Sequence, residues 1–187
     1  MFGKMFWQYV LRDGAILGLV MALSHVFESW MLMCDWPLNQ VSLYISIEML
    51  AAAIFFVWYI YRSTKRCSLA MESEQGFPYT AALFYAMMMS LLAGVLAGLS
   101  QSIYTSIIGY GAYIDGYIAR LEEMLSLMPM DSTTFDNVID QLRATEQPSV
   151  FANVFSSMNT YMFFGAIVGL IVAAIVRRNP QNGNITK

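Results

Sequence analysis

The chain has 187 residues, of which 58% are hydrophobic and 12% are charged. Soluble domains carry about 25% charged residues, so this chain has too few polar side chains to cover a water-facing globule. A formal net charge of -3 gives no sign of the concentrated basic surface that nucleic-acid binding requires. The composition therefore predicts an integral membrane protein that contacts the lipid bilayer and has no nucleic-acid partner.

Four stretches are long and apolar enough to cross a bilayer, which takes roughly 20 mainly apolar residues per helix. They run from about residues 14–34, 41–61, 79–108 and 155–176. Because few charges fall inside them, helices are expected rather than the short alternating strands of a barrel. The sequence predicts a single all-α membrane domain over residues 1–187, built as an integral membrane four-helix bundle.

The basic residues predict an orientation for these spans. Eight of the ten lie before the first span, between the second and third, or after the fourth. The positive-inside rule assigns that side to the cytoplasm. We therefore expect a multi-pass protein of the bacterial inner membrane, with both termini cytoplasmic.

The two cysteines are expected in different compartments. Cys34 falls at the outer end of the first span, and Cys67 falls in the cytoplasmic loop after the second. This topology excludes a disulfide between them. The first span is expected to remain in the protein, since it is too long for the apolar core of a signal peptide.

Residues 112–150 differ in composition from the rest of the chain. They hold seven of the thirteen acidic residues and only two basic ones, Arg120 and Arg143. Apolar residues recur there at helical spacing, first at Ile114, Ile118, Leu121, Leu125 and Met128, then at Phe135, Val138, Ile139 and Leu142. The stretch from Met128 to Ser132 separates the two stripes, and Asp131 or Ser132 can cap the second helix.

The pattern predicts an extramembrane amphipathic helical pair between the third and fourth spans. Two interpretations of its apolar stripes are open. The stripes pack on each other and on the outer ends of the spans, or they form a docking surface for a membrane-protein partner.

Three spans carry G-x-x-x-G pairs, which allow helix backbones to approach closely in lipid. The pairs are Gly14 with Gly18, Gly94 with Gly98, and Gly165 with Gly169. We interpret them as packing sites within one chain, with a homo-oligomer contact as the alternative.

Three ionisable residues fall inside the first two spans, where such groups are costly and indicate a functional site. A rise of about 1.5 Å per residue places Glu28 about 9 Å and His25 about 13 Å below Cys34, and Glu48 about 10 Å below Val41. All three are thus expected in one layer of the outer half of the membrane. Polar residues of the third and fourth spans fall near the same layer, namely Ser100, Gln101, Ser102, Tyr104, Asn159, Thr160 and Tyr161.

This layer has two interpretations. Glu28 and Glu48 share a proton and pass it through His25, in a proton site or a cavity for a cationic or hydroxyl-rich ligand. Alternatively, the side chains are hydrated or bonded to one another and have only a structural role. A metal site is the weakest interpretation, since no ligand spacing supports it. No motif for catalysis or for a cofactor is present, so neither an enzyme nor a cofactor is expected.

Several local features recur in order along the chain. The first helix begins Gly14-Ala15-Ile16-Leu17-Gly18-Leu19, and Gly76-Phe77 leads through Thr80-Ala81-Ala82-Leu83-Phe84 into a glycine-containing helix. An acidic helical segment precedes Pro148-Ser149-Val150-Phe151, and the last helix ends with Gly165-Ala166-Ile167-Val168-Gly169 and Arg177-Arg178. Together these features resemble a bacterial membrane family catalogued as domain of unknown function 4199. The resemblance implies a four-span membrane protein and assigns no catalytic residues.

Two functional hypotheses follow. The first is a non-enzymatic structural or accessory component of a membrane complex, with residues 112–150 available to a partner. The second is a small proton-coupled transporter or ligand-binding membrane protein that uses His25, Glu28 and Glu48, with Gln101, Asn159 and Tyr161 in the same site.

Overall fold

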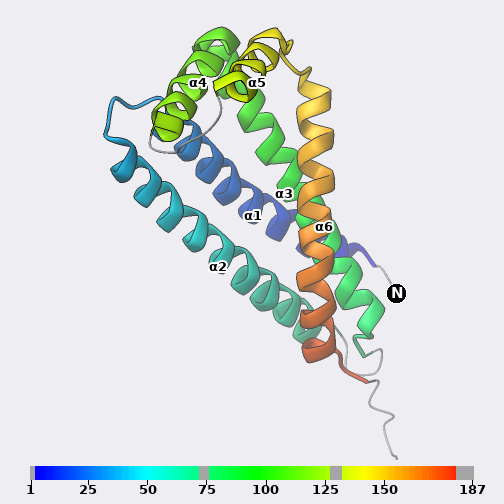
Figure 1. Ribbon diagram of the computed structural model, residues 1–187. Coiled ribbons are helices and arrows are strands. Elements are labelled where there is room, and N and C mark those ends of the chain that lie inside the picture. Colours follow the sequence, from blue (N-terminus) through cyan, green and yellow to red (C-terminus); the bar gives the residue numbers. More distant parts are fainter. Residues whose placement is uncertain (1–2, 72–75, 127–131, 180–187) are drawn as a thin grey trace, which may run out of the picture.

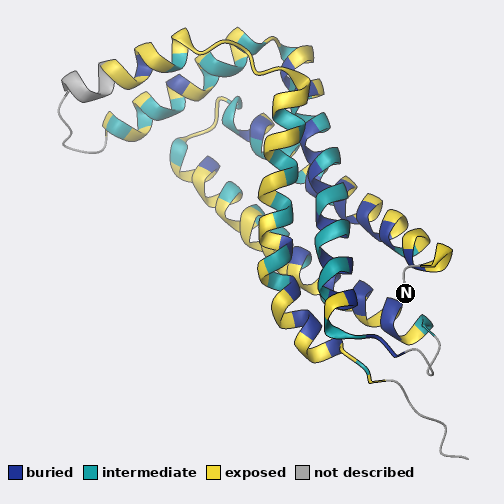
Figure 2. Cartoon of the chain, turned by 90° about the vertical axis from the view of Figure 1, so that its right-hand side faces the viewer, coloured by how far each residue is buried: buried dark blue, intermediate teal, exposed yellow. Residues whose placement is uncertain are grey.

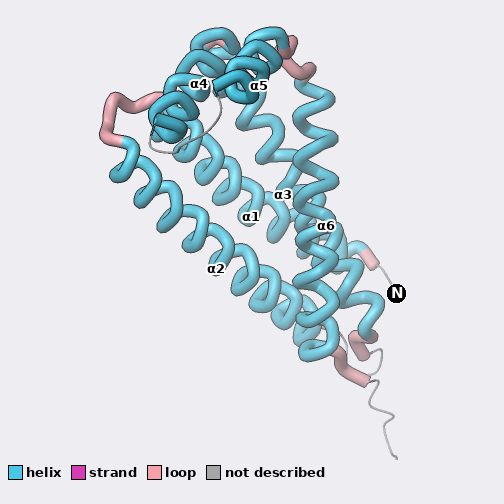
Figure 3. The backbone as a smooth tube through the Cα atoms, viewed as in Figure 1, coloured by secondary structure: helices cyan, strands magenta, loops and turns pink. Residues whose placement is uncertain are grey.

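A computed structural model describes residues 3–71, 76–126 and 132–179, without the side chains of 132–136. These parts of the chain form six α-helices and one isolated antiparallel bridge (Figure 1, Figure 3). The helices are α1 (Lys4–Leu32), α2 (Leu38–Ala70), α3 (Tyr79–Ile108), α4 (Tyr110–Ser126), α5 (Ser132–Ala144) and α6 (Val150–Val176). Four of them, α1, α2, α3 and α6, have the length and apolar composition to cross a membrane. The prediction of an all-α, multi-pass membrane protein is confirmed.

The helices continue past the spans expected from hydropathy. Helix α1 begins at Lys4, and α2 continues to Ala70. Cys67, which we expected in a loop, therefore lies inside α2 and is fully buried. The error arose because hydropathy marks where apolar residues end, whereas a helix continues as long as its backbone hydrogen bonds do.

Helix α3 is the centre of the bundle and packs most extensively against α6 and α1. Its inward face consists largely of small residues, including Ala86, Ala93 and Ala97, so its neighbours approach closely. Figure 2 shows the buried residues concentrated along these contacts. Helix α2 lies at the periphery of the bundle. Only 11% of the residues in its apolar 18-residue stretch are buried.

All three glycine pairs lie at contacts of α3. Gly14 and Gly18 of α1 face Leu92, Ala93 and Leu96 of α3, while Gly165 and Gly169 of α6 face α3 around Ala86 and Ser90. Gly94 and Gly98 face the backbone of α6, where an added Cβ at Gly98 would lie 2.6 Å from the Val154 Cα. Such distances leave no room for a side chain. Because these positions are glycines, α1, α3 and α6 can pack closely against one another within one chain.

The expected helical pair corresponds to α4 and α5, which project from one end of the bundle (Figure 2). Gly109 has a φ of +92°, and this left-handed conformation changes the chain direction between α3 and α4. On the predicted stripes, Ile118 and Ile139 are buried, whereas Val138 is exposed. Of the interruption that we placed from Met128 to Ser132, residues 128–131 lie outside the described residues, and α5 begins at Ser132.

The opposite end of the bundle holds the start of α1 and the end of α6 (Figure 1). Phe77 and Arg178 exchange two backbone hydrogen bonds of 2.7 and 2.8 Å, which join the segment before α3 to the end of α6. The Arg178 guanidinium also donates to the Met71 carbonyl at 2.7 Å. These bonds secure the ends of α2, α3 and α6 to one another.

Candidate functional site

The three ionisable residues of the predicted layer lie between α1, α2 and α6. Helix α1 supplies His25 and Glu28, and α2 supplies Glu48. A short turn makes these two helices antiparallel, so residues at similar distances from the turn face each other. Helix α6 adds Tyr161 from the other side.

His25 is the centre of the hydrogen-bonded group. Its Nδ1 lies 3.3 Å from Glu28 Oε2, which is three residues further along α1 on the same helix face. Its Nε2 lies 2.9 Å from the Tyr161 hydroxyl, and the two rings meet edge to face. Both ring nitrogens therefore have partners, and α1 is joined to α6 through a polar contact.

Glu48 approaches the same group from α2. The Ser24 hydroxyl donates to Glu48 Oε1, and the carboxyl group of Glu48 lies near enough to that of Glu28 for the two to interact electrostatically. No described residue provides a hydrogen-bond partner for Glu48 Oε2, although this atom is buried. A buried carboxylate oxygen without a partner is costly, and a proton or a donor from a ligand would remove that cost.

A pocket of about 530 Å³ opens beside this group. Ser24, His25, Glu28 and Tyr161 form one polar wall, and Ser156, Ser157 and Thr160 of α6 also line the pocket. Its other walls are mostly apolar and include Met21, Met49, Ala52, Ala53, Phe56, Val57, Phe164 and Val168. Several of these residues, such as Met49 and Phe164, also lie on the exposed surface of the helices. We call this pocket the crevice; it has a polar wall and an apolar wall that continues onto the membrane-facing surface.

Of the other residues predicted for the layer, Thr160 lines the crevice and the rest lie elsewhere. Gln101 accepts a hydrogen bond of 3.2 Å from Ser29, outside the crevice, and Asn159 is exposed and lines no wall of it. Ser100 and Ser102 donate to carbonyls of their own helix, and Tyr104 contacts the Met33 sulfur. Depth alone predicted these positions, but helix rotation turns the side chains of α3 away from the crevice.

A second buried polar cluster was missed by the sequence analysis. Asp13 is fully buried, and its Oδ1 accepts hydrogen bonds from Arg12 Nε at 2.9 Å and Arg66 Nη2 at 2.7 Å. Its Oδ2 accepts from the Tyr85 hydroxyl at 2.5 Å. Asp13 falls in the helical series Phe6, Val10, Asp13, Leu17, whose other members are apolar. This spacing identifies an acidic residue on the buried face, a signal that was readable but lay outside the predicted span.

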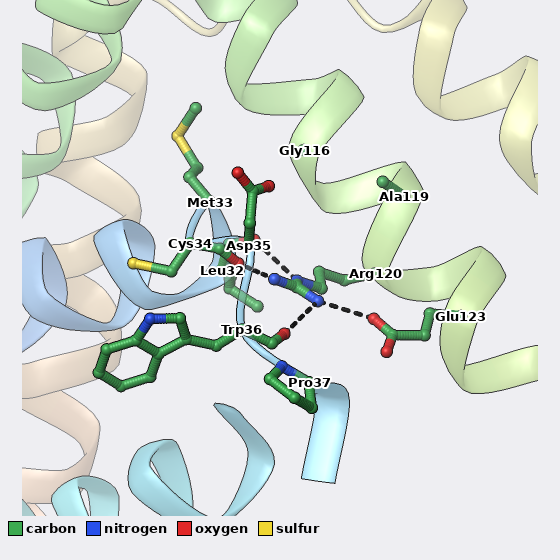
Figure 4. A pocket seen from close by; sticks show the side chains of 10 residues that line it. All are labelled: Leu32, Met33, Cys34, Asp35, Trp36, Pro37, Gly116, Ala119, Arg120 and Glu123. Atoms are coloured by element: carbon green, nitrogen blue, oxygen red, sulfur yellow. Dashed lines mark hydrogen bonds and ion pairs between the residues drawn. The ribbon is translucent and has the colours of Figure 1, made fainter. Parts of the chain in front are cut away.

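A third polar site joins α4 to the turn between α1 and α2 (Figure 4). The Arg120 guanidinium donates to the carbonyls of Leu32 and Trp36 at 3.2 and 3.0 Å, and to that of Cys34. Glu123 pairs with Arg120 at 2.7 Å and accepts from the Leu38 amide at 3.1 Å. The positively charged Arg120 thus binds carbonyl groups at the end of α1, and the negatively charged Glu123 caps the start of α2.

The Arg120 site shows that α4 packs on the ends of the spans. A pocket of about 440 Å³ lies beside it, between the turn and α4. In the parts of the chain that the structure describes, no group of three or more His, Cys, Asp or Glu residues is arranged to hold a metal ion.

Helices and site together define a multi-pass, all-α membrane protein with a polar crevice among its helices. The model of the family described as "Protein of unknown function (DUF4199)" matches residues 12–178, and the chain belongs to this family. The match includes the crevice, the Asp13 cluster and the Arg120 site. No curated protein and no solved structure matches the chain.

Proposed function

We propose that this protein binds a positively charged amphiphile in the crevice, as a non-enzymatic component of the bacterial inner membrane. The observation that carries the proposal is the convergence of His25, Glu28 and Tyr161 on one wall of a mostly apolar pocket. Pockets of this kind, mostly apolar with a few convergent polar groups, are typical of small-molecule sites.

The charge of the polar wall favours a cation. Glu28 supplies a carboxyl group to the wall itself, and Glu48, which does not line the pocket, bonds to the wall through Ser24. The described residues that line the crevice include no lysine or arginine, so its only basic group is the imidazole of His25. An ammonium group would donate to Glu28, and its chain would lie along Met49, Phe56 and neighbouring apolar side chains.

A binding role is favoured over catalysis by the way in which the crevice residues are paired. Ser24 donates its hydroxyl to Glu48, whereas His25 pairs with Glu28 and Tyr161. A nucleophilic serine would need the histidine as its base, with a third group orienting the histidine. The contacts instead leave Ser24 bonded to Glu48 and His25 bonded to Glu28 and Tyr161, so the serine has no base, which suits a site that recognises a ligand.

The proposed orientation has both termini in the cytoplasm. It is supported by the clustering of basic residues at the end of the bundle that holds Lys4, Arg66 and Arg177. The crevice then lies in the outer half of the bilayer, and α4 and α5 lie outside. Their acidic surface is the part of the chain that we propose for contact with a partner, if the protein acts as an accessory component of a complex.

A proton-coupled transporter is the second candidate. It is favoured by the proximity of Glu28 and Glu48 beside His25, since two neighbouring carboxyl groups and an imidazole can exchange one proton. The Glu48→Gln variant would abolish a proton-linked activity while leaving ligand binding only weakened.

The test uses the fact that His25 is the only histidine in the chain. Tag-free protein labelled at histidine is titrated with dodecylamine in detergent, and the imidazole NMR signals are followed. We expect saturable shifts with dodecylamine, and weaker binding in Glu28→Gln but not in Glu122→Gln, an acidic residue on the exposed face of α4. Equal shifts with dodecanol, or equal binding by both variants, would refute recognition of the positive charge.

A further inference from the structure

The Asp13 cluster lies apart from the crevice and has no role in the function proposed above. Asp13 has no exposed surface, whereas the side chains of Arg12 and Arg66 remain 49% and 44% exposed. One carboxylate oxygen thus holds two guanidinium groups, and each arginine side chain is about half exposed.

The arrangement leaves both charge and hydrogen-bond donors available. Two guanidinium groups and one carboxylate carry one excess positive charge. Each guanidinium has five N–H donors, and one from each is directed at Asp13. The Tyr85 hydroxyl donates to the second oxygen of Asp13, so both oxygens of the carboxylate are held by hydrogen bonds. The guanidinium groups are therefore positioned before any ligand arrives, which lowers the cost of binding an anion.

The helix segments that carry the two arginines also expose apolar residues, and the Arg12 guanidinium lies 4.6 Å from the ring centre of Tyr9. Leu11 precedes Arg12 on α1, and Leu69 follows Arg66 on α2; these leucines are 57% and 66% exposed. One turn earlier on α2, the Arg62 guanidinium lies 5.0 Å from the ring centre of Trp58, itself exposed. Basic groups beside tryptophan and exposed leucines are typical of the depth at which lipid headgroups meet acyl chains.

We propose that Arg12 and Arg66, held together by Asp13, bind the phosphate of an anionic phospholipid. Guanidinium groups match the oxygens of a phosphate, and the neighbouring leucines offer a surface to the acyl chains. A phospholipid is favoured over free phosphate as the ligand because both helices also expose leucines near the charged groups. A lipid bound here would bridge α1 and α2, in the peripheral part of the bundle.

The experiment measures lipid binding to the purified full chain by native mass spectrometry. Phosphatidylglycerol and phosphatidylcholine are compared, with inorganic phosphate as a competitor. We expect phosphatidylglycerol to bind more tightly, and Arg66→Gln to weaken it about fivefold or more. Arg143→Gln on α5, which removes the same charge at the other end of the molecule, should leave the affinity unchanged.

The Arg66→Gln variant also loses a bond to Asp13, so its thermal unfolding is measured without phosphatidylglycerol. If it does not fold, Arg66→Lys takes its place; it keeps the charge but loses the planar group, and we expect an intermediate loss of affinity. Three results would overturn the proposal. The first is an unchanged affinity for phosphatidylglycerol in Arg66→Lys, and the second is an equal loss of affinity in Arg66→Gln and Arg143→Gln. The third is equal binding of phosphatidylglycerol and phosphatidylcholine. Full competition by inorganic phosphate would assign the site to the free ion instead.

Discussion

Replacing Gly98 with alanine tests the packing of α3 against α6. An alanine Cβ would lie 2.6 Å from the Val154 Cα and 2.9 Å from the Asn153 carbonyl oxygen. Both are backbone atoms, so α3 and α6 must separate locally to accept the methyl group. Overpacking of this kind costs about 1–3 kcal/mol. The gain in helix propensity returns up to about 1 kcal/mol, so we expect a net loss of stability of roughly 1–2 kcal/mol.

The assay is equilibrium unfolding by titration with sodium dodecyl sulfate in mixed micelles. Gly116→Ala is the matched control, because Gly116 also lies inside a helix but its added Cβ would make an ordinary contact of 3.4 Å with Met33. This control should be neutral or stabilised by up to about 1 kcal/mol. Equal unfolding free energies for Gly98→Ala and Gly116→Ala would refute the close approach of α3 and α6.

Three further predictions concern the polar contacts. Asp13→Ala leaves the guanidinium groups and the Tyr85 hydroxyl without their buried acceptor, and should lower the unfolding free energy by about 2–3 kcal/mol; a loss below about 0.5 kcal/mol would contradict the cluster. Arg120→Gln should accelerate hydrogen exchange in the turn between α1 and α2, whereas Arg143→Gln should not, and equal rates would argue against the contact of α4 with that turn. Tyr161→Phe should shift the His25 NMR signals and cost about 0.5–1.5 kcal/mol, and unchanged signals would disprove the hydrogen bond.

The crevice and the Asp13 cluster differ in what surrounds their polar groups. Asp13 has hydrogen-bond partners on both oxygens and no exposed surface, which describes a group that organises its neighbours. The crevice group is partly open, borders a pocket, and contains a Glu48 oxygen without a partner among the described residues. A ligand therefore has more to gain in the crevice, while at the Asp13 cluster it would contact only the outward sides of the arginines.

Much of the architecture could be read from the order of residues alone. Long apolar stretches identified the membrane class, the four spans and the all-α fold, because the bilayer requires each span to satisfy its own backbone hydrogen bonds. The spacing of Ile118 and its neighbours likewise indicated the helical pair that became α4 and α5. His25 and Glu28 were expected on one face because three residues make almost one helical turn. All of these are local properties of one segment.

Only the tertiary structure decided which segments meet, and at what rotation. Asn159 and Tyr161 lie two positions apart on α6, yet only Tyr161 contacts His25. Hydropathy cannot separate these cases, because lipid and the interior of a bundle are similarly apolar and either can cover the same helix face. For the same reason the distant partners of Asp13 and Arg120 were not foreseen. Arg66 and Tyr85 reach Asp13, and the carbonyls of the turn reach Arg120, only because of how whole helices pack.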